Sequence, residues 1–204
     1  MPSYRLILAS TSPRRRQLLA DAGFVFEAKD PGDAEDAVHR AVSPEALAVE
    51  KARLKARAVA LSLSGPRPAL IVGADTLVAA GHEVLGKPVD RTDAKSILTR
   101  LSGTRHQVIS GVCVWPVMAN SVRQLAPWTA EVSTWVTMRK VDEAEIDAYV
   151  ASGESDGKAG AYAIQERGDR FVEKIDGSFA NVVGFPIELF RETLPRLLKE
   201  WELE

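Results

Sequence analysis

The chain has 204 residues, of which 46% are hydrophobic and 26% charged, proportions typical of a globular protein with a substantial buried core. Its formal net charge of −2 excludes the broad basic field with which proteins bind nucleic acid non-specifically. The single cysteine, Cys113, excludes an intramolecular disulfide framework, and the three histidines lack the spacing of a zinc site. We therefore expect one domain over residues 1–204, located in a reducing cytoplasm, with no stable nucleic-acid partner.

The N-terminal third of the chain predicts a strand and two helices. The apolar run at residues 6–9 is too short for a signal sequence or a membrane span of roughly 20 residues, so we interpret it as a strand. A polar loop follows, and then a helix that closes at Gly23. Ser43 and Pro44 mark the start of a long helix. We assign its apolar face to Leu47, Leu54, Ala58 and Leu61.

The middle of the chain predicts strands around one more helix. Residues 69–72 form a β-branched apolar run, and we expect this strand to end at residues 73–76. Residues 77–80 and 83–85 predict a hairpin, and Thr92 is expected to cap the helix that follows. Two further strands are predicted by alternating patterns, which favour half-buried strands at residues 106–115 and 129–138.

The C-terminal part predicts two helices and a short strand between them. Asp142 and Glu145 form a capping box at the start of the first helix. The strand is expected at residues 171–175, and Pro186 opens a terminal helix that Pro195 should kink or split. We see no internal repeat or linker, so the sequence predicts a compact mixed α/β protein.

Three consecutive arginines, residues 14–16, stand at the start of the first predicted helix. An exposed basic surface is the ordinary interpretation of such a run. Here the arginines oppose the usual preference for acidic side chains near the positive end of a helix. A phosphate bound at the helix N-terminus would resolve this conflict. Because consecutive helical residues point about 100° apart, at most two arginines should face one ligand.

Other candidate residues are weak signals when taken singly. Asp75 follows an apolar strand but could simply form a turn, and Lys87 between Gly86 and Pro88 could be an exposed turn lysine. Lys51 lies in the long helix beside Glu50 and near other basic residues, where exposure of Lys51 is the default expectation.

Taken together, the candidate residues indicate a function more specifically, because the sequence resembles the Maf family across seven ordered blocks between residues 8 and 184. The blocks are Leu8-Ala-Ser-Thr-Ser-Pro-Arg-Arg15, Glu50-Lys-Ala52, Gly73-Ala-Asp-Thr76, Gly86-Lys-Pro88, Leu101-Ser-Gly-Thr-Arg-His-Gln-Val108, Lys158-Ala-Gly-Ala-Tyr-Ala-Ile-Gln165 and Gly177-Ser-Phe-Ala-Asn-Val-Val-Gly184.

The resemblance implies an α/β fold like that of the inosine triphosphate pyrophosphatases: a single two-lobed domain with an elongated, bent mixed sheet flanked by helices. It also implies cleavage of a nucleoside triphosphate between its α and β phosphates, dependence on a divalent cation (Mg²⁺ or Mn²⁺), and usually a homodimer. Asp75 would be the catalytic base and a metal ligand. The implied phosphate-binding residues are Ser10, Arg14, Arg15, Lys51 and Lys87.

Two further assignments come from the resemblance. Glu35 matches a family carboxylate that serves the metal, with an acidic surface loop as the alternative. Thr76 and Gln165 match the branch of the family that acts on thymidine and uridine nucleotides, in which the Gln165 amide would pair with the base edge. A buried Gln165 that ties down its own loop is the structural alternative.

The sequence departs from the family pattern at two positions in the later part of the chain. Phe179 stands where many relatives have Tyr, and Gly157 precedes Lys158 where bacterial relatives often have Asp. These changes concern loop packing more than catalysis. Two other functions remain open, namely hydrolysis of 7-methylguanosine triphosphate and a nucleotide-binding role in regulating cell division.

Overall fold

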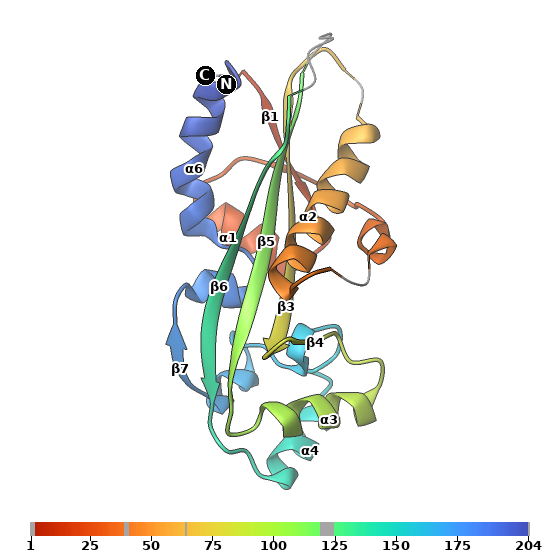
Figure 1. Ribbon diagram of the computed structural model, residues 1–204, viewed down its shortest axis with the longest axis vertical. Coiled ribbons are helices and arrows are strands. Elements are labelled where there is room, and N and C mark those ends of the chain that lie inside the picture. Colours follow the sequence, from red (N-terminus) through yellow and green to blue (C-terminus); the bar gives the residue numbers. More distant parts are fainter. Residues whose placement is uncertain (1–2, 39–40, 64, 119–124, 204) are drawn as a thin grey trace. The chain divides into compact units, whose positions relative to one another are not determined.

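The computed structural model describes residues 3–38, 41–63, 65–118 and 125–203. The chain divides into two compact units (Figure 1). The first unit comprises Met1–Asp75, Ser110–Val132 and Gly184–Glu204, and the second comprises Thr76–Ile109 and Ser133–Val183. Within the described ranges, no helix is long and apolar enough to cross a membrane.

A seven-stranded mixed sheet runs through the described residues in the order β2-β1-β3-β5-β6-β7, with β4 paired to β3. Both β2 and β3 pair with β1 in parallel, whereas β4 is antiparallel to β3 and β7 is antiparallel to β6. The strands are β1 (Arg5–Ala9), β2 (Glu27–Lys29), β3 (Ala69–Ala80), β4 (Glu83–Leu85), β5 (Arg105–Val117), β6 (Trp128–Met138) and β7 (Val172–Asp176). The predicted mixed α/β class is confirmed.

Six α-helices and three short 3-10 helices accompany the sheet in the described part of the chain. The α-helices are α1 (Pro13–Asp21), α2 (Pro44–Leu61), α3 (Arg91–Leu101), α4 (Glu143–Ala151), α5 (Phe179–Val183) and α6 (Ile187–Glu200). The 3-10 helices are η1 (Ala34–Ala37), η2 (Ala159–Ala161) and η3 (Arg167–Phe171).

In the first unit, helices cover both faces of the sheet, because side chains of a strand alternate between its faces. Leu6 and Leu8 of β1 belong to a core cluster with residues of α1 and α6. Ile7 and Ala9 belong to another cluster, whose helical residues come from α2. Figure 1 shows α2 and α6 on opposite sides of the strands.

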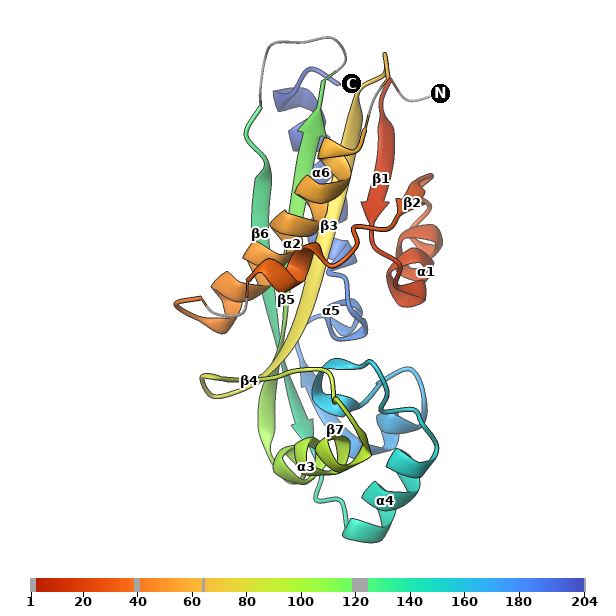
Figure 2. The ribbon, with the colours of Figure 1, turned by 90° about the vertical axis from the view of Figure 1, so that its right-hand side faces the viewer.

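The second unit has a core of its own. Ile97 and Leu101 of α3 pack in one cluster with Ile146 and Tyr149 of α4, and Figure 2 shows these two helices side by side. His106 is fully buried, its Nε2 lies 2.8 Å from the Tyr162 hydroxyl, and burial lowers its pKa to about 4. His106 is therefore neutral near pH 7.

Several local predictions are confirmed and others are wrong. The Ser43 and Asp142 side chains cap α2 and α4 as predicted. The cap of α3 is Asp90 rather than Thr92, because the Asp90 carboxylate accepts the Asp93 amide at 2.8 Å. Pro195 does not split α6, which continues through it, although a proline at this position removes one helical hydrogen bond.

The interior of β5 is also not half-buried as predicted. Seven successive residues of this strand, from Val108 to Val114, are buried, so the central part of β5 is covered on both faces.

Candidate active site

Asp75 lies within β3 and not after it. The expectation that the strand ends at residues 73–76 is wrong, since β3 continues from Ala69 to Ala80. As a whole residue Asp75 is 7% exposed, which is unusual for an unpaired acid and indicates a partner.

That partner is Lys55 of α2, whose ammonium lies 2.6 Å from Asp75 Oδ1. The same nitrogen lies 2.6 Å from Oε2 of Glu35, which is in η1. Lys55 is only 5% exposed, although a lysine in a charged helical segment is usually solvated. Glu35 is 20% exposed and paired, which argues against the alternative of an acidic surface loop.

Two glycines explain why Lys55 reaches the sheet. A Cβ at Gly73 would lie 2.1 Å from the Ala52 carbonyl oxygen, and a Cβ at Gly111 would lie 2.2 Å from that of Ala48. The backbone of α2 therefore rests directly on β3 and β5 where these strands lack side chains. Since residues 73 and 75 of a strand share a face, Asp75 faces the same helix.

The apolar face predicted for α2 is confirmed in part, since Leu54 and Ala58 are partly buried. Leu47 is buried, but Leu61 is 73% exposed. The buried face consists mainly of small residues, which allow the close approach of the helix: Pro44, Leu47, Ala48, Ala52, Lys55, Ala56 and Val59.

Ser10 and Arg15 form a second polar group in the first unit. Ser10 follows β1, is 4% exposed, and its hydroxyl accepts the Ser12 amide at 3.2 Å and Arg15 Nη1 at 3.3 Å. Arg15 Nε also donates to the Gly184 carbonyl oxygen at 2.9 Å. Burial lowers the pKa of the Arg15 guanidinium, an effect opposed by the charge of Asp75, and arginine remains protonated at neutral pH.

The other two arginines of this run differ in exposure. Arg16 is exposed, while Arg14 is partly buried. No acidic residue lies in the first turn of α1, and its N-cap residue Ser12 makes no side-chain capping bond. The positive end of this nine-residue helix is thus not neutralised by its own side chains.

Lys51 lies in α2 and is partly buried. It precedes Lys55 by four residues, so the two lysines lie on the same side of the helix. The first unit therefore brings together Glu35, Lys55 and Asp75 directly and places Lys51 one turn away along α2.

The remaining predicted residues belong to the second unit. Lys87 and Gln165 are exposed, and Thr76 is partly buried. Exposure of Gln165 argues against the alternative in which its amide is buried to tie down its own loop.

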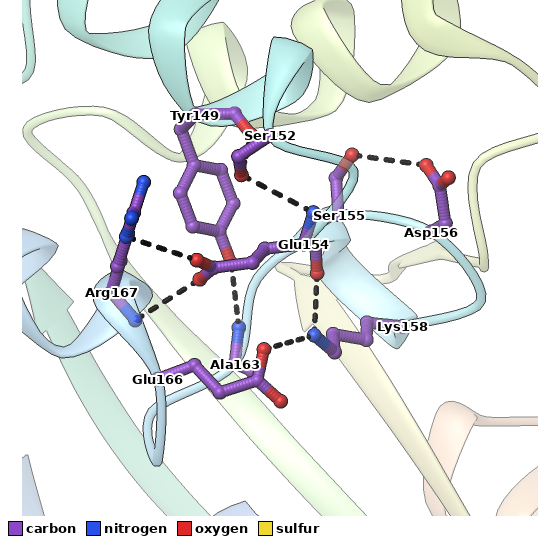
Figure 3. A network of polar contacts seen from close by, with 9 residues as sticks. All are labelled: Tyr149, Ser152, Glu154, Ser155, Asp156, Lys158, Ala163, Glu166 and Arg167. Atoms are coloured by element: carbon purple, nitrogen blue, oxygen red, sulfur yellow. Dashed lines mark hydrogen bonds and ion pairs between the residues drawn. The ribbon is translucent and has the colours of Figure 1, made fainter.

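The loop that carries Gln165 is fixed by other residues (Figure 3). Lys158 Nζ donates to the Glu154 carbonyl oxygen at 2.6 Å and to Glu166 Oε2 at 2.7 Å. The Tyr149 hydroxyl accepts the Ala163 amide at 3.2 Å, and the Glu154 carboxylate accepts the Arg167 amide at 3.0 Å. These contacts hold both sides of Gln165 in place.

The same loop is connected to the segment that carries Lys87. The Gly160 amide donates to the Gly86 carbonyl oxygen at 3.1 Å. Gly160 has a φ of 72°, a conformation that favours glycine, and a Cβ there would lie 2.8 Å from Val78 Cγ2.

A divalent cation, which the resemblance implies, fits the pair of carboxylates in the first unit. Both carboxylate oxygens contact one ammonium, so they can be at most twice the 2.6 Å contact distance apart and converge on a single positive charge. The residues that the structure describes hold no group of three or more potential ligands. Mg²⁺ commonly uses one or two carboxylates together with substrate phosphates and water, so two suffice.

Comparison with known proteins identifies the family. The model of the family described as Maf-like protein matches residues 5–197. The chain belongs to the Maf family. A relative from Anaeromyxobacter dehalogenans, named dTTP/UTP pyrophosphatase, is 46% identical to this Maf protein over 90% of the chain and 89% of its own length.

Further relatives carry the same name. The dTTP/UTP pyrophosphatase of Deinococcus radiodurans is 41% identical over 91% of this Maf protein and 89% of its own length. A solved dITP/XTP pyrophosphatase from Mycobacterium abscessus is 13% identical with a TM-score of 0.36, covering 67% of this chain and 75% of its own.

Proposed function

We propose that the chain hydrolyses dTTP and UTP to the nucleoside monophosphate and pyrophosphate, and so removes unwanted nucleotides from the cellular pool. The observation that carries this proposal is identity of 41–46% over about nine tenths of the chain to relatives named dTTP/UTP pyrophosphatase. The pair formed by buried Asp75 and partly buried Glu35, close to cationic side chains, supports it, because hydrolysis of a triphosphate needs a base and charge compensation.

The triphosphate would bind at the N-terminus of α1 and along α2. Arg15 is already oriented by Gly184 and Ser10, so little side-chain entropy is lost when it binds a phosphate. The Ser10 hydroxyl accepts two hydrogen bonds and can donate its own proton to a phosphate oxygen. Arg14 and Lys51 would supply further positive charge.

Asp75 would accept the proton of the attacking water. Its place in a strand fixes its backbone, and burial next to α2 limits its side chain, so the base is held in one geometry. Glu35 and Asp75 would hold a divalent ion, Mg²⁺ or Mn²⁺, which when bound compensates the charge of the phosphates. Arg15 and Lys51 would stabilise the charge that develops on the pyrophosphate leaving group.

Three further site residues, Thr76, Lys87 and Gln165, are proposed from the resemblance to the family alone. Thr76 and Gln165 are proposed to select the base and Lys87 to contact the phosphates, on the resemblance to the family. The amide of Gln165 is exposed, and hydrogen bonds of neighbouring residues hold its loop in place. Both features support a role in selecting the base, since the amide can donate one hydrogen bond and accept another at a pyrimidine edge.

We further propose that residues 1–204 form one functional domain, that the protein is a homodimer, and that it acts in the cytoplasm. The family match over residues 5–197 supports the first of these. Light scattering on the purified protein would measure the oligomeric state directly.

The experiment that tests the function is a screen of nucleoside triphosphates with Mg²⁺ and Mn²⁺ in ¹⁸O-labelled water. We expect pyrophosphate release from dTTP and UTP in preference to CTP, GTP and 7-methylguanosine triphosphate. Attack at the α phosphorus places the label in the monophosphate and leaves pyrophosphate unlabelled. Label in pyrophosphate, or stepwise release of orthophosphate, would refute the proposed reaction.

A further inference from the structure

Lys55 is the most deeply buried cationic side chain of the candidate site, and the family roles described above do not include it. Its ammonium lies 2.6 Å from an oxygen of Asp75 and 2.6 Å from an oxygen of Glu35. The side chains of these three residues are 6%, 10% and 20% exposed, so solvent screens their charges only weakly.

The charges of the three residues do not balance. Two carboxylates and one ammonium carry a net charge of −1, and each oxygen that contacts the ammonium is one that a divalent ion would also use. The backbone of Lys55 cannot move far, since α2 is held against the sheet at Gly73 and Gly111. Its side chain, however, can rotate about four single bonds.

We propose that Lys55 is a positioning residue that compensates the negative charge of the Glu35 and Asp75 carboxylates in the substrate-free protein. Its ammonium competes with the divalent ion for these two carboxylates. Lys55 keeps the two like-charged groups together, which would otherwise repel each other. It thereby weakens the affinity of the substrate-free protein for the metal, so that tight metal binding requires the phosphates of the nucleotide. This inference rests on the metal site of the proposed function.

The test is the affinity of the substrate-free protein for Mn²⁺, measured by electron paramagnetic resonance of the unbound ion. Lys55→Met keeps the length of the side chain and removes its charge. We expect it to bind Mn²⁺ at least about tenfold more tightly than the wild type, because a unit positive charge is removed next to the ion. Arg57→Met is the matched control, since it removes a charge from an exposed position of the same helix and should leave the affinity unchanged.

A second substitution localises the effect. The double variant Lys55→Met with Glu35→Gln should lose the gain in affinity, because one of the two carboxylates is then neutral. If Lys55→Met does not fold, as judged by circular dichroism, Lys55→Gln provides the same test with a polar side chain. Folded Lys55 variants whose Mn²⁺ affinity equals that of the wild type would overturn the inference, as would a gain that survives Glu35→Gln.

Failure of the proposed function is distinguishable from failure of this inference. The Mn²⁺ measurement uses no nucleotide, so a tighter-binding Lys55→Met protein supports the role of Lys55 even if dTTP and UTP are not hydrolysed. Conversely, selective hydrolysis of dTTP with unchanged Mn²⁺ affinity in Lys55→Met would leave the function standing and refute the role of Lys55.

Discussion

Gly111→Ala tests whether close contact between α2 and the sheet is required for stability. The added Cβ would lie 2.2 Å from the Ala48 carbonyl carbon and oxygen and 2.4 Å from the Val49 nitrogen. All three are backbone atoms of a helix, so the helix itself must shift to relieve the overlap. Overpacking of a core typically costs about 1–3 kcal/mol, and an alanine in place of glycine recovers roughly 0.4–1 kcal/mol through the unfolded state. Because the overlap is with backbone, we expect a net loss of about 2 kcal/mol.

The assay is urea-induced unfolding of the purified variant followed by circular dichroism. The midpoint should fall while the slope of the unfolding free energy against urea stays constant. Gly86→Ala is the matched control, since no atom lies within 4 Å of its added Cβ, and its unfolding free energy should change by less than about 0.5 kcal/mol. A Gly111→Ala protein as stable as this control would refute the contact between α2 and β5 as described.

Three further predictions concern the site and the second unit. Asp75→Asn should lower kcat for dTTP by about 10² to 10⁴-fold, as expected for loss of a general base, and retention of more than about a tenth of the activity would exclude that role. Gln165→Ala should reduce kcat/KM for dTTP and UTP more than for CTP and GTP, whereas equal losses on all four would show that Gln165 does not select the base. Burial lowers the pKa of His106 from 6.5 to about 4, so the imidazole binds a proton more readily in the unfolded chain than in the folded one. His106 should therefore lower the free energy of unfolding as the pH falls from 6.5 towards about 4. Between pH 7.5 and 4.5 the unfolding free energy of the wild type should therefore drop by about 2–3 kcal/mol more than that of His106→Asn, and parallel pH profiles would contradict the assignment.

Local signals in the sequence predicted the order of helices and strands well, because they depend on neighbouring residues. The Ser43 and Asp142 caps are examples, since a capping side chain bonds to an amide of its own helix. The predicted end of the strand at Gly73 was wrong because the role of this glycine depends on a segment distant in sequence. A glycine after an apolar run is typical of a strand end, yet here it admits the backbone of a helix distant in sequence.

The candidate site was predicted in part. A sequence block indicated Asp75, and Glu35 was assigned outside the blocks by its distance from Gly23; the structure brings both carboxylates to one ammonium. Lys55 was missed because a lysine in a charged helical segment is usually exposed. The signal was present in the small residues around it: Ala48, Ala52, Ala56 and Val59 define a buried stripe on which Lys55 also lies. Such a stripe can be recognised in the sequence only when alanines are counted as core-forming residues.

The continuity of β3 through Asp75 has a consequence for the motions that can accompany turnover. A carboxylate on a loop can be withdrawn or delivered by rearrangement of the backbone, but the backbone of Asp75 belongs to a strand inside the sheet. Amide hydrogens in such strands exchange with solvent mainly when a large part of the fold opens. The backbone of Asp75 is therefore held by the sheet, and we expect slow conformational steps that accompany turnover to arise in other segments.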